Sequence, residues 1–415
     1  MIRGKSIGLV DYLVIIIQIG YHLSIVSDWV VAKYNIGILV FMLITYLYRF
    51  RVLPINITVF SKNGLVSLFF IILLCDVFQS IFIDIGLFVG NVIFTLNCLL
   101  FAQYLYNIFN KLSMNEKYKL LHPYIVFGLY NVIVVIIAAI LISTGLLNAL
   151  SNPISAGVME NNIRIQDLHY YFPGYLSVLI DGYRVLESIP ILTGLSHEPH
   201  TLCFLIMPIC FMSMQRVTKP LLRLLILFSF IAVMVISMST TAIIVFSVMY
   251  AIEALWNLGV SKKYSNIIVL LLLIVLVGKY FADLIDNTQF LMSSKIDTDT
   301  GSKAYSSNLL LYVVTPKALL GAGNMGVGDF FYGATNQIGL VTCVLDLLFY
   351  ARLCLKVIRL VVSKNPELHY VGLGCLYFTA HALKVSFLVF GYPYLLFIVL
   401  IVDFLSGTHT KKVFK

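Results

Sequence analysis

Long apolar runs constrain this chain more than any other feature of its sequence. Tyr124–Leu147 and Ile267–Gly278, for example, contain no charged residue. A helix needs about 20 predominantly apolar residues to cross the hydrocarbon core of a bilayer. Hydrophobic residues make up 60% of the chain and charged residues 11%, whereas about 25% charged residues is usual in soluble domains. The sequence therefore predicts an all-α polytopic integral membrane protein, with residues 1–415 in one transmembrane domain.

About twelve segments of the sequence are apolar enough to be predicted as transmembrane helices. They lie at roughly 7–26, 35–50, 64–83, 86–109, 123–147, 199–215, 221–238, 240–257, 264–282, 337–360, 368–386 and 388–405. The second and sixth segments are shorter than the roughly 20 residues that a straight helix needs, so we expect them to extend into their flanks. No small-residue cleavage site follows the first segment, so we interpret it as a retained span.

The placement of lysine and arginine orients these segments. If the N-terminus is cytoplasmic, the inner connections and termini collect 20 of the 28 Lys and Arg residues. Cytoplasmic loops carry an excess of these residues, so both termini are predicted to be cytoplasmic. The excess of Lys and Arg in these inner segments explains the net charge of +9, which therefore does not indicate a nucleic-acid partner.

Two connections are long, and both are predicted to lie on the outer side, at about 148–198 and 283–336. Long loops in compact proteins are usually functional. In the first loop, Asn161–Glu187 mixes aromatic and apolar residues with few charges, which predicts a helix lying in the membrane interface.

The charged stretch Tyr183–Pro199 leads from the first long loop into the sixth predicted span. It contains Arg184, His197 and Glu198, and His200 follows it. Ionisable groups at membrane depth are costly unless they face a cavity, which makes them candidates for a functional site. Two structural interpretations stand beside this one. Arg184 and Glu187 have the spacing of a surface pair on a helix, and Glu198 has the position of a residue that complements a helix dipole.

Motifs in and after this stretch occur in a particular order along the outer side. Arg184 is followed by Gly194-Leu-Ser-His-Glu198-Pro199, and one hairpin later comes the small polar segment Ser237-Met-Ser-Thr-Thr241. The second long loop contains Lys303, an apolar segment at 309–314, Pro316, and then Gly321 and Gly323-Asn324. This order resembles that of the O-antigen polymerases (Wzy-type) and the related O-antigen ligases, over about residues 180–330.

The chain departs from this family in one respect. The family usually has an arginine in the second long loop, whereas no arginine occurs here between Arg223 and Arg352. Lysine can hold phosphate as a point charge but lacks the bidentate fork of arginine. Lys303 and Lys384 are the alternatives for a second phosphate-binding cation. His381, near Lys384, could project into the same cavity or serve only in interhelical pairing.

The resemblance implies a GT-C-like glycosyltransferase in a bacterial inner membrane, with a periplasmic active site. Its reaction would join undecaprenyl-pyrophosphate-linked repeat units into O-antigen or capsular polysaccharide. The candidate bases are Glu198, His197 and His200, and the candidate pyrophosphate-binding residues are Arg184, Lys303 and Lys384. Asn324, Gly323 and Tyr183 would line the sugar groove. Implied partners are the lipid-linked glycans, the bilayer and a chain-length regulator membrane protein.

The chemistry of such a site follows from its substrates. A lipid pyrophosphate leaves without protonation, so cations must stabilise the developing negative charge. The acceptor is a sugar hydroxyl, which needs a base within hydrogen-bond reach. Direct displacement would invert the anomeric centre. Asp297 and Asp299 have the spacing of a metal-binding motif but lie in a polar stretch that the sequence predicts to be flexible. We therefore predict a reaction without metal or cofactor.

Two other functions remain open from the sequence. An O-antigen ligase would share the motifs but is expected to carry arginine and histidine in the second long loop, where this chain has neither. A transporter or flippase of lipid-linked sugars would also have about twelve spans. In a transporter, the intramembrane acids Asp346 and Asp403 would be the leading coupling candidates. Transporters usually show two similar halves, and no internal repeat is visible here.

Overall fold

A computed structural model gives the fold. It describes residues 7–20, 31–51, 64–81, 85–110, 112, 114–148, 154–155, 167–171, 175–179, 191–194, 199–214, 217–237, 239–260, 330–382 and 392–406. The described part is mainly helical, as predicted, and it also contains one small sheet.

The N-terminal helices lie close to the segments predicted from the apolar runs. They are α1 (Leu9–Ile19), α3 (Val31–Phe50), α5 (Gly64–Ile81), α6 (Ile85–Phe109), α7 (Met114–Lys117), the 3₁₀ turn η2 (Tyr118–Leu121) and α8 (His122–Ser143). Pro123 lies in the first turn of α8, where its missing N–H leaves no intrahelical bond unmade.

The remaining helices follow the sheet. They are α9 (Pro199–Met214), α10 (Pro220–Ile236), α11 (Thr240–Val260), α15 (Phe330–Val361), α16 (Pro366–Ala382) and α17 (Tyr392–Ser406). The predicted span at 264–282 lies outside the described residues. Helix α15 starts at Phe330, so the second long loop ends earlier than the predicted boundary at 336.

Two helical segments are long and apolar enough to cross a membrane. They are Phe88–Phe109 and Tyr118–Ser143, and the shorter apolar helices include Leu202–Met214 and Pro220–Ile236. Length and composition therefore support membrane-spanning helices at two places among the described residues.

A four-stranded antiparallel sheet occupies part of the first long loop. The strands β1 (Ile154–Ser155), β2 (Asp167–Tyr171), β3 (Tyr175–Leu179) and β4 (Ile191–Gly194) pair in chain order. The predicted interfacial helix at 161–187 is therefore wrong. Aromatic and β-branched residues favour strands, and Pro173 and Gly174, which separate β2 from β3 in the sequence, are typical of turns.

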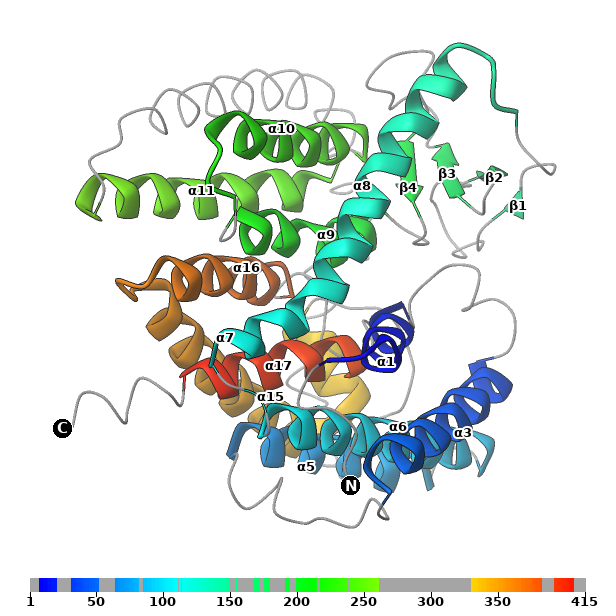
Figure 1. Ribbon diagram of the computed structural model, residues 1–415. Coiled ribbons are helices and arrows are strands. Elements are labelled where there is room, and N and C mark those ends of the chain that lie inside the picture. The colour runs from blue at the N-terminus through cyan, green and yellow to red at the C-terminus, as the bar shows by residue number, and fades with distance from the viewer. Residues whose placement is uncertain are drawn as a thin grey trace.

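Helix α9 lies at the centre of the C-terminal half of the fold. It packs against α8, α10, α11, α16 and β4, and most of its residues are fully buried. In Figure 1, α10, α11, α9 and α16 lie in roughly parallel layers, α8 crosses them obliquely, and the sheet lies beside the upper half of α8, with β4 next to it. Helix α9, which begins at Pro199 of the Gly-x-x-x-Glu-Pro element, is thus packed against other elements on several sides.

Glycines allow α16 to approach its neighbours closely. A Cβ added to Gly374 would lie 2.6 Å from the carbonyl oxygen of Pro208 in α9, and one added to Gly372 would lie 2.6 Å from the backbone nitrogen of Val361. Small residues at helix contacts are characteristic of membrane helix packing, because they let two backbones come together.

Candidate functional site

Most residues of the predicted site lie outside the described residues. This applies to Arg184, His197, Glu198, Lys303, Lys384, Tyr183, Gly323 and Asn324. His200 falls in the first turn of α9, with its backbone described and its side chain not. The described residues nearest to these positions lie at the end of β4 and in the first turns of α9.

Gly194, the first residue of the Gly-x-x-x-Glu-Pro element, ends strand β4 in a conformation that favours glycine. Its φ is +57°, in the left-handed region that L side chains rarely adopt. A Cβ there would lie 2.9 Å from Leu202 Cδ1 of α9 and 3.1 Å from Val135 Cγ2 of α8. Both the turn and the close packing of β4 onto the two helices require a glycine at this position.

The small polar segment Ser237–Thr241 lies beside the first turns of α9. The Cys203 sulfur and the Ser237 hydroxyl are 3.0 Å apart, and the Ser239 hydroxyl accepts a bond of 3.4 Å from the Ala242 N–H at the start of α11. Cys203, Ser237 and Ser239 are all buried. Gly194 of one motif and Ser237 of the other thus contact successive residues of α9, Leu202 and Cys203.

His381, in the last turn of α16, lies against the same part of α9. The Tyr377 hydroxyl and His381 Nδ1 form a hydrogen bond of 3.0 Å. The imidazole contacts the Phe204 ring edge-on, with centroids 5.6 Å apart. His381 is 0% exposed, so it is an internal side chain of the helix bundle.

Pro208 interrupts the hydrogen bonding of α9 just after these residues. A proline inside a helix has no N–H to give to the carbonyl four residues earlier, which here belongs to Phe204. Tyr124 of α8 donates to the Leu205 carbonyl oxygen at 2.6 Å, and its hydroxyl also contacts that of Tyr394. Tyr394 lies 3.4 Å from the carbonyl oxygens of both Phe204 and Leu205. Two neighbouring helices therefore supply hydroxyl groups at the break.

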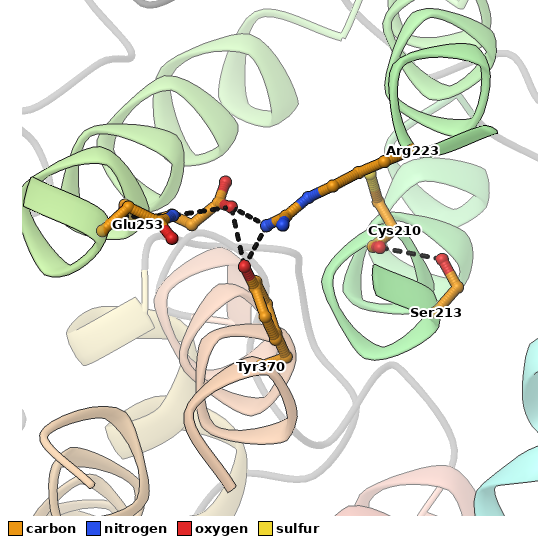
Figure 2. Close-up of polar contacts among 6 residues, drawn as sticks. Cys210, Ser213, Arg223, Glu253 and Tyr370 are labelled. Carbon is orange, nitrogen blue, oxygen red and sulfur yellow. Dashed lines mark hydrogen bonds and ion pairs between the residues drawn. The ribbon is translucent and has the colours of Figure 1, made fainter. Parts of the chain in front are cut away.

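A buried ionic cluster lies at the other end of this helix group (Figure 2). Arg223 of α10 donates hydrogen bonds to Glu253 Oε1 of α11 and to the Tyr370 hydroxyl of α16. Tyr370 and Asn257 donate to the same Glu253 oxygen at 3.1 and 3.2 Å. The Glu253 side chain is 1% exposed and that of Arg223 is 25% exposed. The cluster joins three helices through one carboxylate oxygen.

Two further ion pairs hold helices together among the described residues. Asp11 of α1 accepts bonds from Arg49 of α3 at 3.0 Å and from Tyr104 of α6 at 2.6 Å. Lys356 of α15 pairs with Asp403 of α17. Asp403, one of the two coupling candidates from the sequence, is therefore paired with a lysine. The side chain of Asp346, the other acid singled out, is not described.

No potential metal site occurs in the described ranges, where three His, Cys, Asp or Glu side chains never gather closely enough to hold an ion. Sequence reasoning did not single out the Arg223–Glu253–Tyr370 cluster. Its available signal was Glu253, an acid within the largely apolar helix Thr240–Val260.

Comparison with known proteins adds no assignment. No family model, no curated protein and no solved structure matches this chain.

Proposed function

We propose that this protein is a lipid-linked polysaccharide polymerase of the O-antigen polymerase type. It would transfer a growing glycan from undecaprenyl pyrophosphate to the next lipid-linked repeat unit, at the periplasmic face of a bacterial inner membrane. The observation that supports the proposal is that one residue from each of two motifs contacts the first turns of α9. There, Gly194 packs on Leu202, and Cys203 contacts Ser237 of the small polar segment.

The exposed surface of several helices supports a bilayer environment. On α8 the exposed residues Val126, Tyr130, Ile133, Ile137 and Ile140 recur every three or four positions, so they form one apolar face. In water such a face would be unfavourable, whereas lipid tails cover it without cost. Helices α3 and α10 also expose several large apolar residues.

The ion pairs support the predicted orientation, in which successive helices cross the membrane in opposite directions. The orientation predicted from Lys and Arg places the start of α1, the end of α3 and the end of α6 on the cytoplasmic side. Asp11, Arg49 and Tyr104, which come from these three places, are in contact. The Arg223–Glu253–Tyr370 cluster likewise joins three helix ends that the same orientation places inside. A chain threaded in this way would have its long loops outside.

The proposed reaction assigns roles as follows. Arg184, with Lys303 or Lys384, would stabilise the charge that develops on the departing pyrophosphate. One of Glu198, His197 and His200 would accept the proton of the attacking sugar hydroxyl. The glycosyl–phosphate bond breaks as the new glycosidic bond forms, and the lipid pyrophosphate leaves as an anion. No metal ion or cofactor takes part in this scheme.

The transporter alternative rests on intramembrane acids, of which the sequence singles out Asp346 and Asp403. In the structure Asp403 contacts a lysine of another helix, and Asp11 and Glu253 each contact an arginine of another helix. Acids that serve in coupling must bind and release an ion during transport, whereas these three are already paired with a cation. A ligase would use the same α9 region, so its distinction from a polymerase requires an experiment.

Deletion of the gene, followed by gel analysis of surface polysaccharide, tests the proposal. Loss of a polymerase leaves core carrying a single repeat unit, whereas complete loss of attached polysaccharide indicates a ligase. Polymer of normal length in the deletion strain would contradict both.

Complementation with site variants then tests the assigned residues. We expect Arg184→Ala and Glu198→Ala to abolish polymer at unchanged protein levels. Arg164→Ala and Glu160→Ala, in the same outer loop, are matched controls and should restore polymer. Polymer of wild-type length from Arg184→Ala and Glu198→Ala would return these residues to the surface-pair and helix-capping interpretations.

A further inference from the structure

Three buried polar side chains occur close together near the end of α16. Tyr377, Thr379 and His381 are each 0% exposed, although the helices around them pack mainly through apolar groups. The Thr379 hydroxyl donates to the Cys375 and Leu376 carbonyl oxygens of its own helix. Tyr377 and His381 instead bond to each other through their side chains. All three side chains thus bond within α16, and the His381 ring of the Tyr377–His381 pair also meets Phe204 of α9.

The His381 ring is fixed in orientation by two contacts. Nδ1 is held by the Tyr377 hydroxyl at 3.0 Å, and the ring meets Phe204 of α9 at an interplanar angle of 72°. Phe204 also contacts Phe378 of α16, with ring centroids 4.6 Å apart. Phe204 therefore connects α9 to both His381 and Phe378 near the end of α16.

The start of α9 is held from two other sides. Gly194 of β4 packs against Leu202, and Cys203 contacts Ser237 at the end of α10. Leu202, Cys203 and Phe204 are consecutive, so three successive side chains meet three different parts of the fold. They lie about one turn after His200. Pro208 removes one hydrogen bond of α9 about one turn later. The position of the first turns therefore depends more on the contacts of Leu202, Cys203 and Phe204 with other elements.

We propose that His381, hydrogen-bonded to Tyr377, is a positioning residue for the proposed glycosyl transfer. Through Phe204 it fixes the first turns of α9, where the candidate base His200 lies. The inference rests on the proposed function. Misplacement of a catalytic group by about 1 Å can lower the rate about 100-fold, so a contact one turn away is close enough to affect the rate.

The test uses purified full-length protein in liposomes, with an undecaprenyl-pyrophosphate-linked repeat unit as substrate. We expect His381→Leu to lower kcat by about 10- to 100-fold with little change in KM. Tyr377→Phe should act in the same direction, and the double variant should be no worse than His381→Leu, because the two side chains act as one unit. His381→Gln, which keeps a polar partner for Tyr377, should retain more activity than His381→Leu.

Thr379→Val is the matched control, because Thr379 is equally buried in the same turns and its hydroxyl donates only to carbonyl oxygens of α16, which the substitution leaves in place. It should keep kcat close to the wild-type value. Unchanged kcat in His381→Leu would overturn the inference, as would an equal loss of kcat in Thr379→Val. If the wild-type protein does not extend the substrate, the proposed function itself is contradicted. This outcome is read from the wild-type reaction alone, whereas the inference is tested by comparing the variants with the wild type.

Discussion

Replacement of Gly194 by alanine tests the geometry at the start of α9. At φ +57° an L residue brings its Cβ close to the following carbonyl, which costs about 1–2 kcal/mol. The new methyl group would also lie 2.9 Å from Leu202 Cδ1 and 3.1 Å from Val135 Cγ2. Overpacking of a core by a single group typically costs about 1–3 kcal/mol. We therefore expect Gly194→Ala to lower the free energy of unfolding by about 2–5 kcal/mol.

Two other glycines separate these contributions. Gly145 has φ +70°, and nothing lies within 4 Å of the position that a Cβ would take, so Gly145→Ala should show only the backbone cost of about 1–2 kcal/mol. Gly90, inside α6, also has open space and no positive φ. Gly90→Ala should leave stability unchanged or raise it by about 0.5–1 kcal/mol. All three changes restrict the unfolded chain similarly, so that effect largely cancels in the comparison.

The apparent melting temperature of purified protein in one detergent is a suitable measurement. The expected order is Gly90→Ala highest, then Gly145→Ala, then Gly194→Ala. If Gly194→Ala melts at or above Gly145→Ala, the close packing of β4 between α8 and α9 is wrong.

Two further predictions concern buried polar contacts. Glu253→Ala should destabilise the protein by about 3 kcal/mol, near the low end for breaking a buried pair because Arg223 keeps some access to water. Removal of both charges in Arg223→Leu/Glu253→Leu should recover most of that loss, and a double variant less stable than Glu253→Ala would contradict the pairing. Tyr124→Phe should cost about 0.5–1.5 kcal/mol, because it removes the 2.6 Å donor to the buried Leu205 carbonyl and leaves the Tyr394 hydroxyl at 3.4 Å. Tyr48→Phe, at an exposed position of α3, is its control, and equal melting temperatures for the two would refute the role of Tyr124. Thermal unfolding in detergent measures both effects.

The helices could be predicted from the sequence because their signal is local. An apolar run is visible without knowledge of any neighbour, so α6 and α8 start and end within a few residues of their predicted limits. The sheet was missed because hydrophobicity and aromatic content alone do not distinguish an interfacial helix from strands. The short runs of aromatic and aliphatic residues on either side of Pro173-Gly174, at 168–172 and 175–180, were the discriminating signal.

The polar contacts could not be predicted because they depend on tertiary structure. Arg223 and Tyr370 are 147 residues apart in the chain, and Lys356 and Asp403 are 47 apart. Nothing in the local sequence specifies such a partner. Gly194 and Ser237 were selected as parts of a motif, and their positions beside Leu202 and Cys203 became visible only with the packing of α9.

Polymerisation by the purified protein tests the central claim most directly. The protein would be reconstituted in liposomes with undecaprenyl-pyrophosphate-linked repeat units, and product length followed on a gel over time. We predict a ladder that lengthens with wild-type protein and with Arg164→Ala, and only single units with Arg184→Ala. Single units with the wild-type protein, or a wild-type ladder from Arg184→Ala, would contradict the claim.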